Sequence, residues 1–253
     1  APSSREHDDG RLMGGREAPA ATFAWAKDWA EHLRGLMARL GDSAFGAPSG
    51  LPGWTRAHLL THVARNADEL VDVLETARTG TPGEVRDAAR RAAEIEEGAR
   101  RTPEEIRADV VESSDRLADA VRRLPEKAWS ATVEYAGRRI PATEVLWLRA
   151  VETWVHAVDL DVGASFVDLP QPMLLALIAE AAATVPDRSD APALVLVATG
   201  DPAGRWTVGE PGPDALEISG SAAELAEWLT GRAAGRHLRR RPNTPLPELA
   251  PWR

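Results

Sequence analysis

The segment Pro141–Leu160, PATEVLWLRAVETWVHAVDL, is the part of the sequence that decides the fold. Read as a helix, it places Glu152 and His156 four residues apart, one above the other on the same face. A carboxylate and an imidazole in this arrangement can bind one metal ion, but two ligands do not hold a catalytic ion. The segment therefore predicts a metal-binding helix that starts near Pro141 and depends on a second helix for a further ligand.

The further ligand is expected upstream, in GWTRAHLLTHVARNADEL, where His62 lies on a second helical pattern that follows the N-cap residue Thr55. Two histidines and one carboxylate leave coordination positions open, as catalytic zinc sites do. His58, one turn before His62, is a competing ligand that we assign to packing or to the surface. Asp159 shares the face of His156, so it is a candidate to hold that imidazole, to carry a proton, or merely to end the helix with a polar group.

The same residues also have simpler interpretations. A glutamate and a histidine at this spacing form ordinary surface pairs, and a single histidine in a helix is usually packed or exposed. If a metal binds, mononuclear iron is an alternative to zinc, whereas a di-iron centre would pair two Glu-x-x-His motifs. Among the nine tryptophans, we interpret Trp147 and Trp154 as core residues and Trp54 as a hydrophobic staple at the start of its helix.

The composition limits the chemistry that the chain can perform. The 253 residues are 43% hydrophobic and 27% charged, which is typical of a globular protein. A net charge of −9 argues against a nucleic-acid partner. Because there are no cysteines, a cysteine nucleophile, a thiolate metal ligand and disulfides are excluded. No apolar run approaches the ~20 residues of a membrane span and the N-terminal stretch lacks a secretory signal, so we expect a cytoplasmic monomer without a membrane partner.

The order of the expected elements predicts an α+β protein. Residues 1–20 should form a disordered arm, residues 21–163 a metal-binding helical bundle, and residues 166–253 a small α/β domain that ends in a proline-rich tail. The long amphipathic helices of the second of these regions favour a four-helix bundle. They are expected over about 22–40, 55–79, 103–124 and 141–160, and the third should begin at a capping box formed by Thr102 and Glu105.

Shorter elements are expected between and after these helices. The charged residues 84–100 form either a solvated helix or an irregular lid, and the alternation in WSATVEYAGRRIP predicts a short strand or hairpin. In the last region, ALVLVAT, RWTVGE and ALEISG are expected strands. Ser221 opens a capping box at the start of a helix that ends near Gly231.

GWTRAHLLTHVARNA and WSATVEYAGRRIPATEVLWLRAVETWVHAVDL resemble the mycothiol-dependent maleylpyruvate isomerases, which belong to the DinB-like metal-binding superfamily of four-helix bundles. The similarity covers nearly the whole chain after the N-terminal arm. It implies a zinc ion held by His62, Glu152 and His156, and it matches Asp159 to the aspartate of the family's HAVD segment.

The tail segment EISGSAAELAEWLTGRAAGR matches the family more loosely. A functional arginine of the family's tail corresponds to Arg232, and Arg236 offers a rival alignment. From the residues alone, Arg232 is either a surface arginine placed favourably at a helix C-terminus or a clamp for a substrate carboxylate.

The resemblance implies a zinc- and mycothiol-dependent cis–trans isomerase that converts maleylpyruvate to fumarylpyruvate. A thiolate adds to the cis double bond, the resulting single bond rotates, and loss of the thiol leaves the trans product. Zinc would deprotonate the thiol, and mycothiol would bring the sulfur that the chain lacks. Two alternatives stay open: a mycothiol S-transferase that forms or exchanges a thioether conjugate with an electrophilic small molecule, and a non-catalytic metal-binding bundle.

Overall fold

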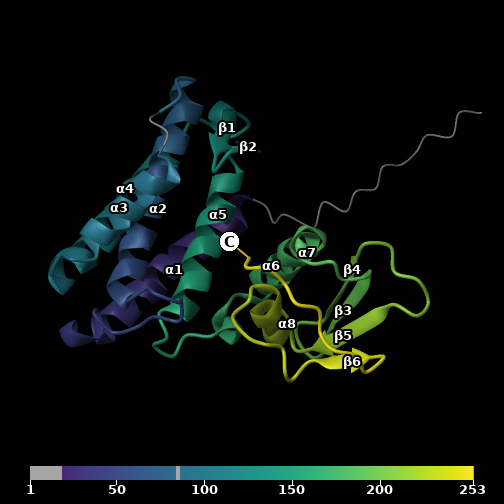
Figure 1. Cartoon of the computed structure of the whole chain (residues 1–253). Coiled ribbons are helices and arrows are strands. Elements are labelled where there is room, and N and C mark those ends of the chain that lie inside the picture. Colours follow the sequence, from purple (N-terminus) through teal and green to yellow (C-terminus); the bar gives the residue numbers. More distant parts are fainter. Residues whose placement is uncertain (1–18, 84–85, 253) are drawn as a thin grey trace, which may run out of the picture. The chain divides into compact units, whose positions relative to one another are not determined.

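A computed structural model describes residues 19–83 and 86–252 of the chain (Figure 1). The chain divides between Leu169 and Pro170 into two compact units, which we call the helical unit and the C-terminal unit. Together they have the mixed helix and sheet content of the expected α+β class. The arm expected over residues 1–20 lies outside the described residues, except for Pro19 and Ala20, which belong to the first helix. Among the described helices, none is long and apolar enough to cross a membrane.

The helical unit contains the long helices that the sequence predicts, and the charged stretch left open by the sequence forms a helix rather than an irregular lid. Helix α2 packs against α3, α4 and α5, and α1 packs against α5 (Figure 1). The bounds are α1 Pro19–Arg39, α2 Arg56–Thr79, α3 Ala88–Gly98, α4 Pro103–Arg123 and α5 Glu144–Asp159, with short 3-10 turns at Asp42–Ala44, Glu126–Ala128 and Phe166–Asp168.

Side-chain caps set the starting points of α2 and α4. The hydroxyl of Thr55 accepts a hydrogen bond from the backbone N–H of His58, and the His58 ring accepts one from the backbone N–H of Thr55. Thr102 and Glu105 form the equivalent capping box at α4, as the sequence predicts. Because a helix repeats every 3.6 residues, fixing its first residue also fixes the direction of every later side chain.

A hairpin leads into α5 and delays its start. Strands β1 (Thr132–Tyr135) and β2 (Arg138–Pro141) are antiparallel, which confirms the expected hairpin. The expectation that the metal helix starts near Pro141 is corrected, because this proline is the last residue of β2 and pairs with Thr132. A proline has no N–H to donate to a strand, so it is tolerated at a strand end. The helix itself begins three residues later, at Glu144.

Helix α5 is buried along most of its length, which makes it the central element of the helical unit. Trp147 and Trp154 are 7% and 6% exposed, so their interpretation as core residues is confirmed. The indole N–H of Trp154 donates to the backbone carbonyl of Trp25 on α1, at 3.2 Å. Burial of this kind holds the backbone of α5 rigidly, and the polar side chains that it carries inward gain a well-defined position.

The C-terminal unit combines two packed helices, α6 and α8, with a four-stranded sheet in the order β4-β3-β5-β6 (Figure 1). Strand β3 is parallel to β5 and antiparallel to β4, and β6 is antiparallel to β5. The capping box at Ser221 is confirmed. The elements are α6 Gln171–Ala183, α7 Val185–Arg188, β3 Leu194–Ala198, β4 Gly204–Val208, β5 Leu216–Gly220, α8 Ala222–Leu229 and β6 Arg239–Arg241.

Candidate metal centre

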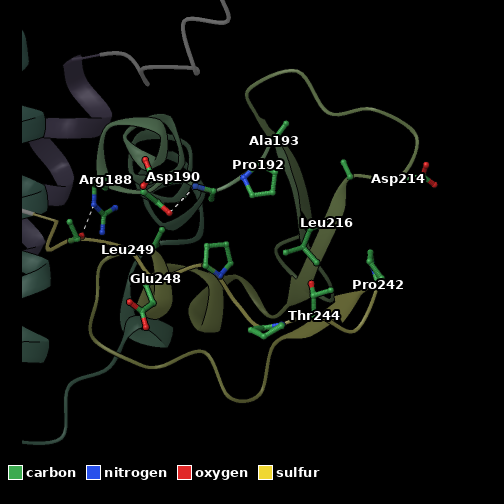
Figure 2. Close-up of a pocket in the computed structure, with 16 residues that line it drawn as sticks. Arg188, Asp190, Pro192, Ala193, Asp214, Leu216, Pro242, Thr244, Glu248 and Leu249 are labelled. Atoms are coloured by element: carbon green, nitrogen blue, oxygen red, sulfur yellow. Dashed lines mark hydrogen bonds between the residues drawn. The ribbon is translucent and has the colours of Figure 1, made fainter.

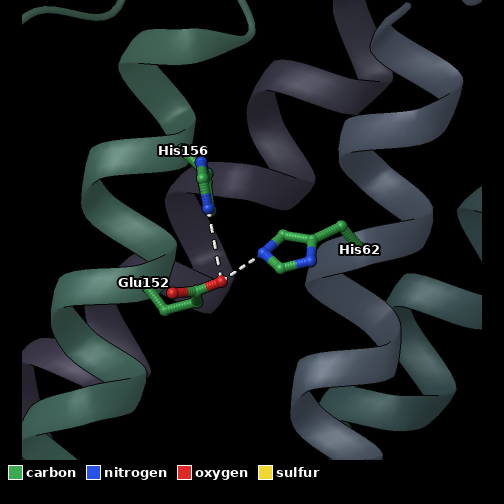
Figure 3. Close-up of side chains that lie close together, drawn as sticks. All are labelled: His62, Glu152 and His156. Atoms are coloured by element: carbon green, nitrogen blue, oxygen red, sulfur yellow. Dashed lines mark hydrogen bonds and ion pairs between the residues drawn. The ribbon is translucent and has the colours of Figure 1, made fainter. Parts of the chain in front are cut away.

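Three side chains from two helices converge inside the helical unit (Figure 3). His62 on α2 and Glu152 and His156 on α5 each offer one ligand atom, and these atoms all lie within 4.8 Å of one another. Oε1 of Glu152 contacts Nε2 of His62 and lies 3.2 Å from Nε2 of His156. We call these residues the triad; they are the three metal ligands expected from the sequence, and the structure brings them together.

The triad is half-buried and is most accessible at one of its members. The side chains of His62, Glu152 and His156 are 28%, 20% and 13% exposed. The rings of the two histidines stand edge to face, with their centroids 4.9 Å apart. His62 is therefore the member of the triad whose side chain is most exposed to solvent.

A buried carboxylate contacts the ring nitrogen of His156 that points away from the other two triad residues. Asp159 is 3% exposed, and its Oδ2 lies 2.8 Å from Nδ1 of His156. A carboxylate that accepts from one ring nitrogen sets the tautomer, so that the other nitrogen, Nε2, is the one that can bind a metal. Of the three roles open to Asp159 from the sequence, this geometry supports the one in which it holds the imidazole.

The charges of the triad stabilise one another. Burial alone would raise the pKa of Glu152, but the neighbouring His156 and His62 hold the pKa of this carboxyl well below its usual range. Burial would likewise lower the pKa of His156, but the carboxylates of Glu152 and Asp159 raise it to about 9. Without a metal, the site therefore contains an ionised Glu152 and a protonated His156 at neutral pH.

A buried arginine that was not among the residues predicted from the sequence lies one turn before Glu152 on the same helix. Arg149 is 5% exposed, and its Nη1 donates to the carbonyl of Val63 and to Oδ1 of Asn66, both at 2.8 Å. Burial lowers its pKa to about 10, so it remains charged at neutral pH. A charged residue inside an otherwise apolar helical stretch was the signal that could have revealed it.

Two other residues near the triad differ in what they contribute. The ring of Trp54 lies against the ring of His62, with centroids 5.3 Å apart, so this indole borders the triad. His58 bonds to Thr55 in the capping box, and its Nε2 lies 3.4 Å from Oε1 of Glu96. These contacts use both ring nitrogens, which explains why His58 does not belong to the triad.

Arg232 lies in the C-terminal unit, three residues after Leu229, the last residue of α8. Its Nη1 donates to the carbonyl of Thr230 at 2.7 Å, a contact suited to a cation at the C-terminus of a helix. Arg236, the rival in the alignment, is exposed in the same unit.

The C-terminal unit also contains a pocket of about 870 Å³ (Figure 2). Its lining is rich in proline, alanine and leucine, with Arg188 and three acidic residues among them. Nε of Arg188 donates to the carbonyl of Ala250 at 2.9 Å, which ties the proline-rich tail to α7. None of the site residues identified from the sequence lines this pocket.

Comparison with known proteins identifies the family to which the chain is similar. A family model described as the mycothiol maleylpyruvate isomerase N-terminal domain matches residues 25–161. The structure is similar to the crystal structures of the mycothiol-dependent maleylpyruvate isomerase and of a histidine-to-alanine mutant of that enzyme. In each case the identity is 33%, the TM-score is 0.83, and 93% of this chain and 98% of the other are covered. No curated protein matches the sequence. Since the similarity spans both units, the chain belongs to the mycothiol-dependent maleylpyruvate isomerase family.

Proposed function

We propose that this protein is a mycothiol-dependent maleylpyruvate isomerase that uses a zinc ion bound by His62, Glu152 and His156 to form fumarylpyruvate. The observation that carries the proposal is the convergence of these three ligand atoms within 4.8 Å of one another. They converge in a chain that is 33% identical to an enzyme of that activity over 93% of its length.

The donor atoms of the triad suit zinc. Two imidazole nitrogens and one carboxylate oxygen are a common protein ligand set of catalytic zinc, and three protein ligands leave a position open for a further ligand. Asp159 keeps Nε2 of His156 directed at the other two donors. A bound zinc ion would lower the pKa of a thiol that binds to it and would polarise a carbonyl group of the substrate.

The thiol must come from outside the chain, because the sequence contains no cysteine. The thiol of mycothiol would add reversibly to the double bond of maleylpyruvate. Rotation about the resulting single bond, followed by release of the thiol, would give the trans product. The chain's part in this chemistry is to hold the metal, to exclude bulk water from the half-buried triad, and to bind the carboxylates of the substrate.

We assign substrate binding to Arg232. Its planar guanidinium can donate two parallel hydrogen bonds to one carboxylate, which a lysine cannot do. In the same position it would stabilise negative charge that develops on the substrate after addition of the thiol. The match of the tail segment EISGSAAELAEWLTGRAAGR to the family supports this role.

The remaining features of the proposal concern the environment of the protein. We propose a cytoplasmic monomer that acts on a small electrophile and a low-molecular-weight thiol, without nucleic acid or membrane partners. A net charge of −9 supports the absence of a nucleic-acid partner. A cytoplasmic location fits because free thiols are kept reduced there.

The proposed function is tested by supplying purified zinc-loaded protein with excess maleylpyruvate and a catalytic trace of mycothiol. We expect conversion to fumarylpyruvate over many turnovers, with the amount of mycothiol unchanged when measured by mass spectrometry. The matched control is His62→Ala, which should lose both zinc and turnover. Stoichiometric consumption of mycothiol with a stable adduct would instead identify an S-transferase, and no reaction with any electrophile would favour a non-catalytic metal-binding bundle.

A further inference from the structure

The last turn of α5 is held by the segment that leads into α2. The backbone N–H of Gly50 donates to the carbonyl of Asp159 at 2.7 Å. Nε of Arg56 donates to the carbonyl of Leu160 at 2.7 Å, and its Nη2 donates to the carbonyl of Asp161 at 2.9 Å. Three consecutive carbonyls at the end of α5 therefore bond to Arg56, the first residue of α2, and to Gly50 in the segment before it.

These bonds satisfy groups that a helix cannot satisfy by itself. The last carbonyls of a helix lack intrahelical partners, and a nearby arginine is one way to cap them. Asp161 adopts a left-handed backbone conformation, with φ of 54°, which turns the chain away just beyond the helix. The cap is therefore supplied by a residue that is more than a hundred positions away in the sequence.

The connection matters because of where the triad lies on these two helices. Arg56 is the first residue of α2, and His62 follows it by less than two turns. Asp159, whose carbonyl bonds to Gly50, is also the residue whose carboxylate holds His156. A shift of the last turn of α5 relative to the start of α2 would therefore move His156 relative to His62.

We propose that Arg56 is a positioning residue that sets the zinc affinity of the triad by holding the end of α5 against the start of α2. The inference rests on the proposed function, since it requires zinc to be bound by the triad. Arg56 does not touch the ligand atoms; it acts through the backbone of Leu160 and Asp161, and its Nη1 makes a longer hydrogen bond to the carbonyl of Ala44, at 3.4 Å.

The alternative is that Arg56 contributes only to the stability of the fold, and the chain offers a matched control for that role. Nη2 of Arg107 on α4 donates to the carbonyl of Leu40, just beyond α1, at 2.6 Å. Its Nη1 donates to Asp42 at 2.7 Å, and its guanidinium lies 4.6 Å from the centroid of the Phe45 ring. Arg107 therefore caps a helix end in the same unit without bonding to either metal-bearing helix.

The experiment measures zinc affinity and fold stability separately on the full-length protein. Metal-free samples are titrated with zinc in competition with a chromophoric chelator, and their unfolding in urea is followed in parallel. We expect Arg56→Gln to weaken zinc binding about tenfold, the lower end of the range for residues that support metal ligands. Arg107→Gln should lower the stability of the metal-free protein but leave the zinc affinity within about twofold of wild type.

Two further variants test the geometry of the contact. A Cβ added at Gly50 would lie 3.2 Å from the carbonyl oxygen of Asp159, so Gly50→Ala must displace this turn slightly. It should therefore weaken zinc binding without removing a charge. Arg56→Lys keeps the charge but loses the fork that reaches two carbonyls, so its affinity should fall between those of wild type and Arg56→Gln. If Arg56→Gln does not fold, these two variants decide the question.

Each outcome bears on the proposal in a distinct way. If folded Arg56→Gln binds zinc with unchanged affinity, the positioning role is overturned and only a stabilising role is left. The same conclusion follows if Gly50→Ala and Arg56→Lys both bind zinc with unchanged affinity. An equal loss of affinity in Arg107→Gln also overturns it, because the effect would then follow general destabilisation. If the wild-type protein itself does not bind zinc, the proposed metal centre fails and this inference fails with it.

Discussion

Replacing Asp159 by asparagine should weaken zinc binding while the helical unit remains folded. The substitution keeps the size and shape of the side chain, and its amide oxygen can still accept from Nδ1 of His156, which lies 2.8 Å from the carboxylate in the native protein. What is lost is the charge of the acceptor. Because Asp159 is only 3% exposed, solvent does not screen that charge.

The magnitude follows from the strength of this one contact. A hydrogen bond to a charged group contributes about 1.5–3 kcal/mol and a neutral one about 0.5–1.5 kcal/mol. The difference of about 1–1.5 kcal/mol corresponds to roughly a 5- to 13-fold loss of zinc affinity. Asp159→Ala removes the contact altogether, and a loss of about 10- to 100-fold is expected for it.

The pH of the measurement decides how much of this loss is seen. At pH 7.5 zinc must displace the proton of His156, whose pKa is about 9 in the metal-free protein. Asp159 contributes to that raised pKa, so Asp159→Asn also lowers the pKa and reduces the competition from the proton. The two effects oppose each other at pH 7.5. At pH 9.5 the ring is mostly deprotonated, and most of the loss of affinity should appear.

The assay is a titration of metal-free protein against a competing chelator at pH 7.5 and pH 9.5, with circular dichroism to verify the fold. Asp161→Asn is the matched control. Asp161 lies just beyond the same helix, its side chain is exposed, and it accepts the hydrogen bond from Arg56 through its backbone carbonyl. It should bind zinc like the wild type at both values. Folded Asp159→Asn with wild-type affinity at pH 9.5 would refute the claim that Asp159 holds His156 for the metal.

Three further predictions concern the metal ligands, the proton balance and the C-terminal unit. His62→Ala and His156→Ala should each lose most of the bound zinc and stay folded; elemental analysis showing full zinc content in either would contradict the assignment. Zinc binding near pH 7.5 should release about one proton, because the His156 pKa of about 9 means that this ring is protonated before zinc binds. Calorimetry in buffers of different ionisation enthalpy measures the number of protons released. Release of no proton would count against His156 as a zinc ligand. Arg232→Lys should impair turnover nearly as much as Arg232→Ala, by about 30- to 1000-fold, with zinc content unchanged and Arg236→Ala as control. If only Arg236→Ala loses activity, the role of binding the substrate carboxylate belongs to Arg236 instead.

The features that the sequence predicts correctly are those encoded by neighbouring residues. The threonine caps at Thr55 and Thr102 and the serine cap at Ser221 depend on contacts within one turn, and each is found where expected. The common face of Glu152 and His156 follows from helical periodicity alone. Even the exclusion of His58 could have been argued locally, because it occupies the third helical position, from which a side chain bonds back to the cap residue.

The features that the sequence does not reveal depend on contacts between distant residues or on weak patterns. The bonds from Arg56 to the end of α5 join residues 104 and 105 positions apart, so no local pattern contains them. Strand β6 was missed because Arg239–Arg241 has no apolar alternation. It forms at the edge of the sheet by pairing with β5, and charged side chains are suited to an edge because they discourage pairing with another chain.

Arg149 connects the fold of the helical unit to the kind of ligand that the metal centre should accept. Burying an arginine is unfavourable unless opposite charge is near, and the carboxylate of Glu152 supplies part of it. The carboxylate of Asp68 offsets a further part of the Arg149 charge. With zinc bound, the two charges of the ion would balance the carboxylates of Glu152 and Asp159. The chain has no cysteine to provide a thiolate, so a thiolate at the proposed metal centre must be brought in by a small molecule.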